Sequence, residues 1–421
     1  MKSGTLWCAS LLWLCVAARA ETLTMQQALM AARDNVEVAI ARGGLAAARA
    51  DIQAANHAPL PVLSGKFSQI DLQNGVGPGG LIGSKRIDKS VGIDWTWERG
   101  GKRALRTQAA ERLAEAAQAD LDEVVRQQLL AAQAAFLDLL AAQERLAQVE
   151  ALAQDGKQLA VTAAQRVKAG DLPTQDASRI EIETERAIAD AQAAALERQQ
   201  AALALAQLMG RPDVRDALVA EGGWPSPQLA PAGGLDALAQ ARPDVRAADL
   251  RVQAARSAVD GARALRKGDV TWGMSYDHYP GTSRALVELR AQMPLQWGYA
   301  YEGEIGRALA ELQQAEDTLD KVLRAAGIEL QRMQAEAAAM SARAQRYEAE
   351  ILPRARRVAQ AAEQAYRRGA IALTDLLDAR RTLRATLLEA IAAQLDAAKA
   401  IGAWNLRVQP DIVSISSKGQ P

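Results

Sequence analysis

Cysteine and histidine are scarce in this sequence, and their scarcity excludes several classes of function. The only two cysteines, Cys8 and Cys15, lie near the N-terminus, so the chain beyond them holds no disulfide, thiolate metal site or cysteine nucleophile. The only two histidines, His57 and His278, leave little for imidazole catalysis or a zinc site. Without a glycine-rich phosphate loop or a serine–histidine–aspartate set, we expect no enzyme, no catalytic residue, no metal ligand and no cofactor.

The first twenty residues have the pattern of a secretory signal peptide. Lys2 supplies positive charge, residues 6–16 form an apolar run, and residues 18–20 (Ala-Arg-Ala) provide small residues for cleavage. The run is too short to span a bilayer as a helix. We therefore predict an exported protein whose mature chain starts at Glu21.

The mature chain also lacks an excess of either charge. Without Lys2 and Arg19, 48 basic residues face 50 acidic ones, a net charge near −2. The balance gives no reason to expect a nucleic-acid partner. Abundant alanine and few aromatic residues favour long, closely packed helices.

Several landmarks recur in the same order along the chain, which indicates a tandem duplication. The pairs are Gly100 and Gly298 at an offset of 198 residues, Gly170 and Gly369 with Asp176 and Asp375 at 199, and Asn35 and Asp244 at 209. The predicted organisation is a signal peptide (1–20), a first repeat (21–210), a linker (211–234), a second repeat (235–407) and a C-terminal tail (408–421).

Each repeat is predicted to run helix, strand, strand, very long helix, tight turn, long helix. The first repeat opens with a helix over 24–56. Residues 102–168 contain no proline and one glycine, Gly156, and predict a helix roughly 100 Å long at about 1.5 Å per residue. The matching stretch, 299–368, contains Pro353, where we expect a kink or break. Helices of this length need neighbours on both sides.

The segments between the helices alternate apolar and polar residues, which predicts strands with one apolar and one polar face. The alternation is clear over 91–98, 270–277 and 287–296, whereas 60–72 is a strand by repeat symmetry. The apolar face could cover a soluble core or face lipid in a membrane barrel. Four strands cannot close a barrel alone, since an open edge in lipid is costly, so we expect three copies to supply twelve.

The aromatic residues favour the membrane interpretation of these strands. Nine of the fourteen aromatics after residue 20 lie in or beside the strands, as an interfacial girdle requires. The predicted girdle consists of Trp95, Trp97, Trp272, Tyr276, Trp297 and Tyr299. Glycines suited to extracellular turns lie between the first two strands, at Gly75, Gly77, Gly79, Gly80 and Gly83.

From about Leu23 to Asn405, this pattern resembles the TolC family of outer-membrane efflux proteins. Residues 241–245 (Ala-Arg-Pro-Asp-Val) and the turns at Gly170 and Gly369 are similar to family features. Residues 98–103 (Glu-Arg-Gly-Gly-Lys-Arg), and 166–170 followed by Pro173, resemble the cobalt–zinc–cadmium resistance (CzcC-like) branch.

The resemblance implies a mainly α protein with transmembrane β strands. Each chain would be one protomer of a homotrimer, with a shared 12-stranded β-barrel in the bacterial outer membrane continued by a long periplasmic α-helical barrel. Its implied partners are outer-membrane lipid, a periplasmic adaptor (membrane fusion) protein and an inner-membrane RND transporter. The implied activity is passive conduction of divalent heavy-metal cations out of the cell. Alternatives are the same channel for drugs or secreted proteins, and a soluble periplasmic coiled-coil scaffold or adaptor.

The predicted site residues lie at the two helical tips. Gly170 and Gly369 can adopt the positive φ that a tight reversal needs. The family forms its periplasmic entrance and adaptor contact there, which implies roles for Gly170, Asp171, Leu172, Gly369, Ala370 and Ile371.

Two carboxylates just after the second tip are the candidate gate. Asp375 and Asp378 are three residues apart on one helix side, and a ring of such acids favours cations. Tyr366 resembles the family's gate tyrosine, and Asp176 takes the related place in the first repeat. Ile371 stands where the family has a gate arginine. These acids are equally compatible with ordinary N-terminal helix positions that the macrodipole favours.

Overall fold

The computed structural model describes residues 21–70, 73, 75, 87–211, 218–226, 228–231, 233–280 and 282–408. The predicted signal peptide, most of the C-terminal tail and part of the linker lie outside the described residues. The same holds for the predicted turn glycines Gly77, Gly79, Gly80 and Gly83.

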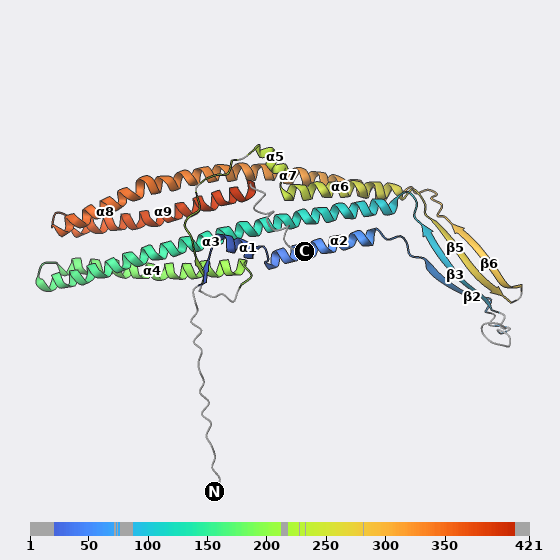
Figure 1. Ribbon diagram of the computed structural model, residues 1–421, viewed down its shortest axis with the longest axis horizontal. Helices are drawn as coiled ribbons and strands as arrows, with labels where there is room; N and C mark the ends of the chain where they lie inside the picture. The colour runs from blue at the N-terminus through green and yellow to red at the C-terminus, as the bar shows by residue number, and fades with distance from the viewer. Residues whose placement is uncertain are drawn as a thin grey trace, which may run out of the picture. The chain divides into compact units, whose positions relative to one another are not determined.

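Long helices make up most of the described chain, with strands between them (Figure 1). In chain order the elements are β1 (Glu21–Leu23), α1 (Met25–Ala32), α2 (Val36–Ala55), β2 (Val62–Ser68), β3 (Asp88–Trp97), α3 (Lys102–Ala169), α4 (Thr174–Leu208), β4 (Leu218–Ala220), α5 (Leu235–Gln240), α6 (Pro243–Ala264), β5 (Val270–Tyr279), β6 (Ser283–Gln292), α7 (Glu302–Arg346), the π-helix η1 (Tyr347–Ile351), α8 (Leu352–Arg367) and α9 (Leu373–Val408).

The predicted long helix of the first repeat is confirmed, because α3 runs unbroken for 68 residues. The single helix predicted over 24–56 is wrong: the chain forms α1 and α2 with a break at residues 33–35. Asn35 is buried in this break, and its side-chain amide donates a 2.6 Å hydrogen bond to Gln128 Oε1. Asparagine favours such breaks because its side chain competes with the helical backbone.

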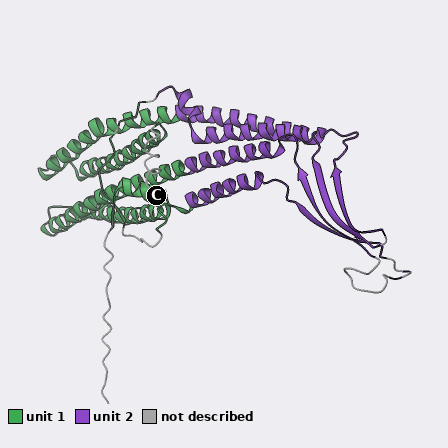
Figure 2. Ribbon diagram, turned by 45° about the vertical axis from the view of Figure 1, so that its right-hand side comes forward, with its two compact units in different colours: residues 1–36, 125–231, 332–421 green, residues 37–124, 232–331 purple. Residues whose placement is uncertain are grey.

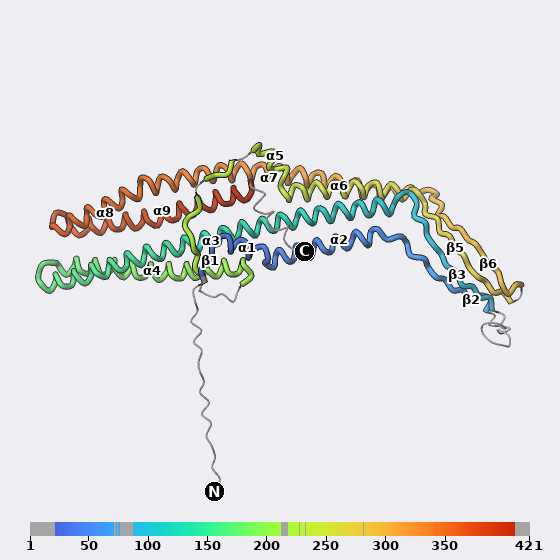
Figure 3. The backbone as a smooth tube through the Cα atoms, in the orientation of Figure 1, coloured from blue at the N-terminus to red at the C-terminus, as the bar shows by residue number. Residues whose placement is uncertain are grey.

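The irregularity predicted at Pro353 is present as a change of helix type. The helix continues as the five-residue π-helix η1, and Pro353 lies in the first turn of α8. Figure 3 traces the chain through the two reversals, from α3 into α4 and from α8 into α9. No helix in the described ranges combines the length and apolarity needed to cross a membrane.

A four-stranded antiparallel sheet has the order β2-β3-β5-β6. The strands predicted near 91–98 and 270–277 are confirmed, and β2 confirms a shorter strand within 60–72. The strand predicted over 287–296 was placed too late, since β6 ends at Gln292. Pro294, which has no backbone N–H for a ladder, follows its end. The short parallel pair β1–β4 was not predicted.

The chain divides into two compact units, coloured separately in Figure 2. Unit 1 comprises residues 1–36, 125–231 and 332–421, and unit 2 comprises residues 37–124 and 232–331. Unit 2 contains the four-stranded sheet, α5 and α6, whereas unit 1 contains α4, α8 and α9. Each unit takes residues from both predicted repeats, so the repeat boundaries stay a prediction from the sequence.

Unit 1 has an apolar core where β1, α1, α3, α4 and β4 meet, with Phe136, Leu139 and Leu205 buried. Near the end of α9, the indole of Trp404 is also fully buried and donates to Ala230 O at 2.9 Å. A buried aromatic of this size with its N–H satisfied anchors the linker segment to α9.

Candidate functional site: a two-faced sheet and two hairpin tips

The sheet of unit 2 presents one apolar face that the described residues leave exposed. Trp95 lies opposite Trp272, Ile93 opposite Met274, and Val91 opposite Tyr276 on β3 and β5. All six side chains are exposed, as are Val287 and Leu289 on β6. A contiguous apolar face of this kind marks a contact with lipid or with another apolar partner.

The predicted girdle residues lie on this sheet or just beyond its helix-facing end. Trp95, Trp97, Trp272 and Tyr276 belong to β3 and β5, whereas Trp297 and Tyr299 follow β6. Each of the six is at least half exposed, from 50 % at Tyr299 to 88 % at Trp297. Their exposure is compatible with the predicted role at a membrane interface.

The opposite face of the sheet is polar and internally hydrogen-bonded. Asp94 on β3, Gly273 on β5 and Arg290 on β6 lie side by side in register. Arg290 Nη2 donates to Asp94 Oδ1 at 2.6 Å, so this ion pair crosses the intervening strand. Two residues along the strands, Thr96 of β3 and Thr271 of β5 are joined by a hydrogen bond of 3.0 Å between their hydroxyls. This face is chemically suited to line water.

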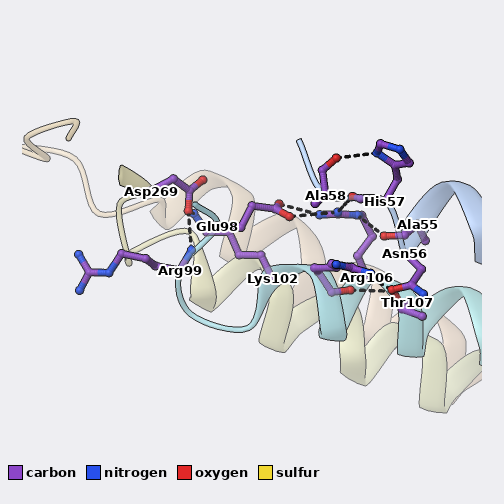
Figure 4. A network of polar contacts seen from close by, with 11 residues as sticks. Ala55, Asn56, His57, Ala58, Glu98, Arg99, Lys102, Arg106, Thr107 and Asp269 are labelled. Carbon is purple, nitrogen blue, oxygen red and sulfur yellow. Dashed lines mark hydrogen bonds and ion pairs between the residues drawn. The ribbon is translucent and has the colours of Figure 1, made fainter. Parts of the chain in front are cut away.

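The junction between sheet and helices is held by charged side chains (Figure 4). Arg106 of α3 forms an ion pair with Glu98 at 3.0 Å, just after β3. The same guanidinium donates to the carbonyls of Ala55 and His57 at 2.9 and 3.0 Å. Cations near the last carbonyls of a helix are favourable, so Arg106 fastens the end of α2 to the start of α3.

Asp269, just before β5, makes the second link of this junction (Figure 4). Its Oδ1 accepts from the backbone N–H of Arg99 at 2.9 Å and from Lys102 Nζ at 2.8 Å. The segment 98–103, singled out in the sequence, therefore ties the β3–α3 turn to the α6–β5 turn. Sequence reasoning identified the segment but not its partner Asp269.

In unit 1, both hairpin tips end their first helix with the same hydrogen-bond pattern. Gly170 has φ +83° and its N–H donates to Val167 O, while Asp171 N–H donates to Arg166 O. Gly369 has φ +73° and makes the equivalent bond to Tyr366 O. The positive φ expected at both glycines is confirmed, and it closes a Schellman motif at each tip.

An apolar cluster joins the two hairpins close to the tips. Ile180 of α4 and Leu373 and Leu376 of α9 are buried together, and Leu172, Tyr366 and Ile371 pack against them. Of the tip residues predicted from the sequence, Gly170, Asp171, Gly369 and Ala370 are exposed. The structure thus places Tyr366 and Ile371 in one apolar cluster, where Ile371 contributes packing rather than charge.

The candidate gate acids Asp375 and Asp378 lie outside this apolar cluster. Asp375 and Asp378 are both exposed on α9, and in the described part of the chain neither carboxylate forms a hydrogen bond or ion pair. Asp176 is half-buried and lies 3.9 Å from Arg179, its neighbour one turn along α4. The helix therefore presents Asp375 and Asp378 on the side opposite to the buried Leu376 and Leu377.

Charged links between α4 and α9 were missed by the sequence reasoning. Arg381 forms an ion pair with Glu183, and Arg384 forms one with Asp190. The hydrogen bond from Arg381 lowers the pKa of the Glu183 carboxyl, although partial burial opposes the shift. No local pattern marks these pairs, because the partners are almost two hundred residues apart.

Three comparisons with known proteins agree with this geometry. Residues 234–403 match the family model described as outer membrane efflux protein. The cobalt-zinc-cadmium resistance protein CzcC of Cupriavidus metallidurans is 30 % identical over 306 residues, which cover 68 % of this chain and 68 % of that protein.

Solved structures show the same fold at lower identity. A membrane protein from Pseudomonas aeruginosa superposes with a TM-score of 0.79 at 18 % identity, covering 91 % of this chain and 93 % of that one. The outer membrane protein VceC of Vibrio cholerae gives 0.75 at 19 % identity, with coverages of 91 % and 95 %. The chain therefore belongs to the TolC family of outer membrane efflux proteins and is an efflux channel of the bacterial outer membrane that extends into the periplasm.

Proposed function

We propose that this chain forms the exit duct of a tripartite pump that expels divalent heavy-metal cations. The assignment of metal cations as the cargo is supported by one observation. The chain is 30 % identical to a protein named for cobalt, zinc and cadmium resistance, over two thirds of both chains. An inner-membrane RND transporter would supply the ions and the energy, and a periplasmic adaptor would join it to this chain. The duct itself conducts passively and performs no chemistry.

The sheet supports a homotrimer. Among the described residues, its edge strands β2 and β6 each have one unpaired side, and an unpaired edge is costly in lipid. Three sheets joined edge to edge supply the twelve strands of a closed barrel. The apolar face with Trp95, Trp97, Trp272 and Tyr276 would then face outer-membrane lipid, with Trp297 and Tyr299 at its boundary.

The tips support the periplasmic entrance. In a trimer, the exposed carboxylates of Asp375 and Asp378 would make a ring of six acids that favours cations. Asp176 and Tyr366 would complete this gate. The exposed turn residues would contact the adaptor, namely Gly170, Asp171, Gly369 and Ala370, flanked by Leu172 and Ile371.

Ion pairs also link the two hairpins of this chain near the entrance. Arg381–Glu183 and Arg384–Asp190 hold α9 against α4. They would take the place of the family's gate arginine, since Ile371 carries no charge.

Retention of metal in cells tests the proposal. A strain without this chain should accumulate more zinc, cobalt or cadmium than one that expresses it, as measured by elemental analysis of washed cells. Asp375→Asn combined with Asp378→Asn should restore export only in part.

The matched control removes two exposed acids from the helical segment that precedes the second tip, Glu336→Gln in α7 with Glu348→Gln in η1. It should export metal like the wild type. Equal metal content with and without the chain, together with retention of organic dyes in its absence, would instead assign the duct to drugs.

A further inference from the structure

The Asp94–Arg290 ion pair spans three strands of the polar face. Asp94 lies on β3 and Arg290 on β6, so the side chains meet over β5 rather than between adjacent strands. Ser64 of β2 donates to Asp94 Oδ2 at 3.3 Å. One carboxylate therefore links side chains from both edge strands of the sheet.

Gly273 provides the space for this pair. A Cβ built at Gly273 would overlap Asp94 Oδ1 severely and would lie 3.1 Å from Arg290 Nη2. Any other residue at this position would push the two charged groups apart. The ion pair therefore requires glycine at position 273. Glycine weakens a strand modestly, and here it is needed despite that cost.

The pair also decides the balance of charge on this face. Where the strands are paired in register, the face carries the acids Asp88, Asp94, Asp277 and Glu288 and only two bases, Lys66 and Arg290. Arg290 lies 2.6 Å from Asp94 and 3.9 Å from Glu288. Because Asp94 neutralises the guanidinium of Arg290, the remaining acids make the electrostatic potential above this face negative.

We propose that Asp94 and Arg290, joined over Gly273, set the ion preference of the barrel lining. This inference rests on the proposed function, in which the polar face lines the pore. Among the described residues of the sheet, Arg290 is the one cation near the middle of this face, and Asp94 neutralises it where exported cations would pass. The pair acts as a specificity determinant separate from the acids at the tips.

Reversal potentials in planar bilayers under a potassium chloride gradient test the charge balance. Asp94→Asn leaves Arg290 without its main partner and should lower the cation-to-anion permeability ratio by about twofold at 0.1 M salt, where screening is substantial. Arg290→Gln should raise the ratio by a similar factor, and the double variant should return near the wild type. Lys89→Gln is the control, because Lys89 alternates onto the opposite, apolar face of β3 and forms no hydrogen bond within the described chain.

Heat stability in detergent tests the pair without requiring conduction. Asp94→Asn and Arg290→Gln should each lower the unfolding temperature, and the double variant should lower it by less than their sum. Gly273→Ala should lower it markedly, whereas Gly65→Ala in β2, where a Cβ meets open space, should not.

The two experiments distinguish failure of the selectivity role from failure of the channel function. Channels that open normally but keep the wild-type ratio in both charge variants would overturn the selectivity role alone. Two results would show that the Asp94–Arg290 pair does not stabilise the sheet. One is additive shifts of the unfolding temperature for Asp94→Asn and Arg290→Gln, and the other is equal effects of Gly273→Ala and Gly65→Ala. A wild-type protein that never conducts would contradict the proposed function and with it the selectivity role.

Discussion

The helices that lead to the two tips have the same task but different construction. The first, α3, is a continuous α-helix of 68 residues. The second changes at Tyr347–Ile351 into a π-helix, and Pro353 follows in the next turn. Proline has no N–H and crowds the carbonyl four residues earlier, and the wider π turn accommodates both defects. The first hairpin is therefore reached by one continuous α-helix, whereas the helix that leads to the second tip contains one defined change of helix type, the π turn η1.

The π turn is braced by the helix beside it, α9. Tyr347 donates through its hydroxyl to Glu389 of α9 at 3.3 Å, and Arg343 pairs with Asp396 at 3.1 Å. Arg343 also lies over the Tyr347 ring, 5.8 Å from its centroid. The irregular turn therefore keeps a fixed position on α9 although its own backbone is less regular.

A second contrast lies where each predicted repeat begins. In unit 2, Arg242 is almost fully buried and pairs with Asp244 at 2.7 Å and with Glu329 at 2.8 Å. Burial would lower the pKa of Arg242, but the hydrogen bonds to both acids outweigh it and raise the pKa. In unit 1, Asn35, which aligns with Asp244, donates its side-chain amide to Gln128. The aspartate of the second repeat thus takes part in an ion pair, and the aligned asparagine of the first repeat in an amide hydrogen bond.

The largest expected effect comes from giving the continuous helix α3 a proline. Gln154 is exposed on α3 and lies 199 residues before Pro353, the offset of the tips. Gln154→Pro should lower the free energy of unfolding by about 3 kcal/mol, because α3 has no π turn to accommodate it. Denaturant titration in detergent measures the change. Gln154→Ala is the control and should leave the free energy of unfolding nearly unchanged. Equal stability of the two variants would show that α3 tolerates proline as well as the second hairpin does.

Removing one acid from the buried Arg242 cluster should have the next largest effect. Glu329→Gln leaves the guanidinium with Asp244 alone and should cost about 1–3 kcal/mol of unfolding free energy. Gln128→Ala removes the neutral counterpart and should cost about 1 kcal/mol. The same titration compares them. A larger loss for Gln128→Ala would reverse the ranking of the two contacts.

Acid should weaken the link between α4 and α9. The pKa of Glu183 is lowered by Arg381, so its stabilisation is full above the usual glutamate pKa of about 4.3 and is lost as pH falls through the lowered value. Because the Arg381 side chain is over half exposed, the loss should stay below about 1 kcal/mol.

Unfolding temperatures between pH 6 and pH 3 check this effect. Glu183→Gln should flatten the acid side of the profile, whereas Glu181→Gln, an exposed neighbour on α4, should leave it as in the wild type. Identical profiles for the wild type and Glu183→Gln would show that the pair does not stabilise the folded hairpins.

The smallest effect should follow from removing the proline of the second hairpin. Pro353→Ala restores a backbone donor and should let α-helix replace part of η1. Amides 347–352 should then exchange with deuterium a few-fold more slowly, which corresponds to less than about 1 kcal/mol. The matching segment 148–153 of α3 serves as the internal reference. A slowing shared by both segments would point to a general change rather than to loss of the π turn.

Local signals account for the parts of the fold that the sequence predicts. The proline-free run that forms α3, the alternation in β3 and β5 and the tip glycines each act within a few residues. The break at Asn35 was missed because the hydrogen bond that stabilises it reaches Gln128, nearly a hundred residues away. The form of the irregularity at Pro353 was missed because a proline signals a defect, not how the backbone absorbs it.

The sequence predicts which residues lie at the candidate site, but it does not predict which of their side chains form ion pairs with one another. Asp375 and Asp378 could be placed on one side of α9 from spacing alone, and the structure shows them exposed. The pairs Arg381–Glu183 and Arg290–Asp94 depend on helix packing and strand register, which spacing does not contain. Where charges meet across the fold, three-dimensional structure is required.

The channel function and the trimer can be tested together by single-channel recording of the purified protein in a planar lipid bilayer, with chemical cross-linking to count protomers. Three protomers per particle and discrete, cation-preferring openings are the predicted result. A monomer that never inserts, or a particle that inserts without conducting, would contradict the account of this chain as an exit duct.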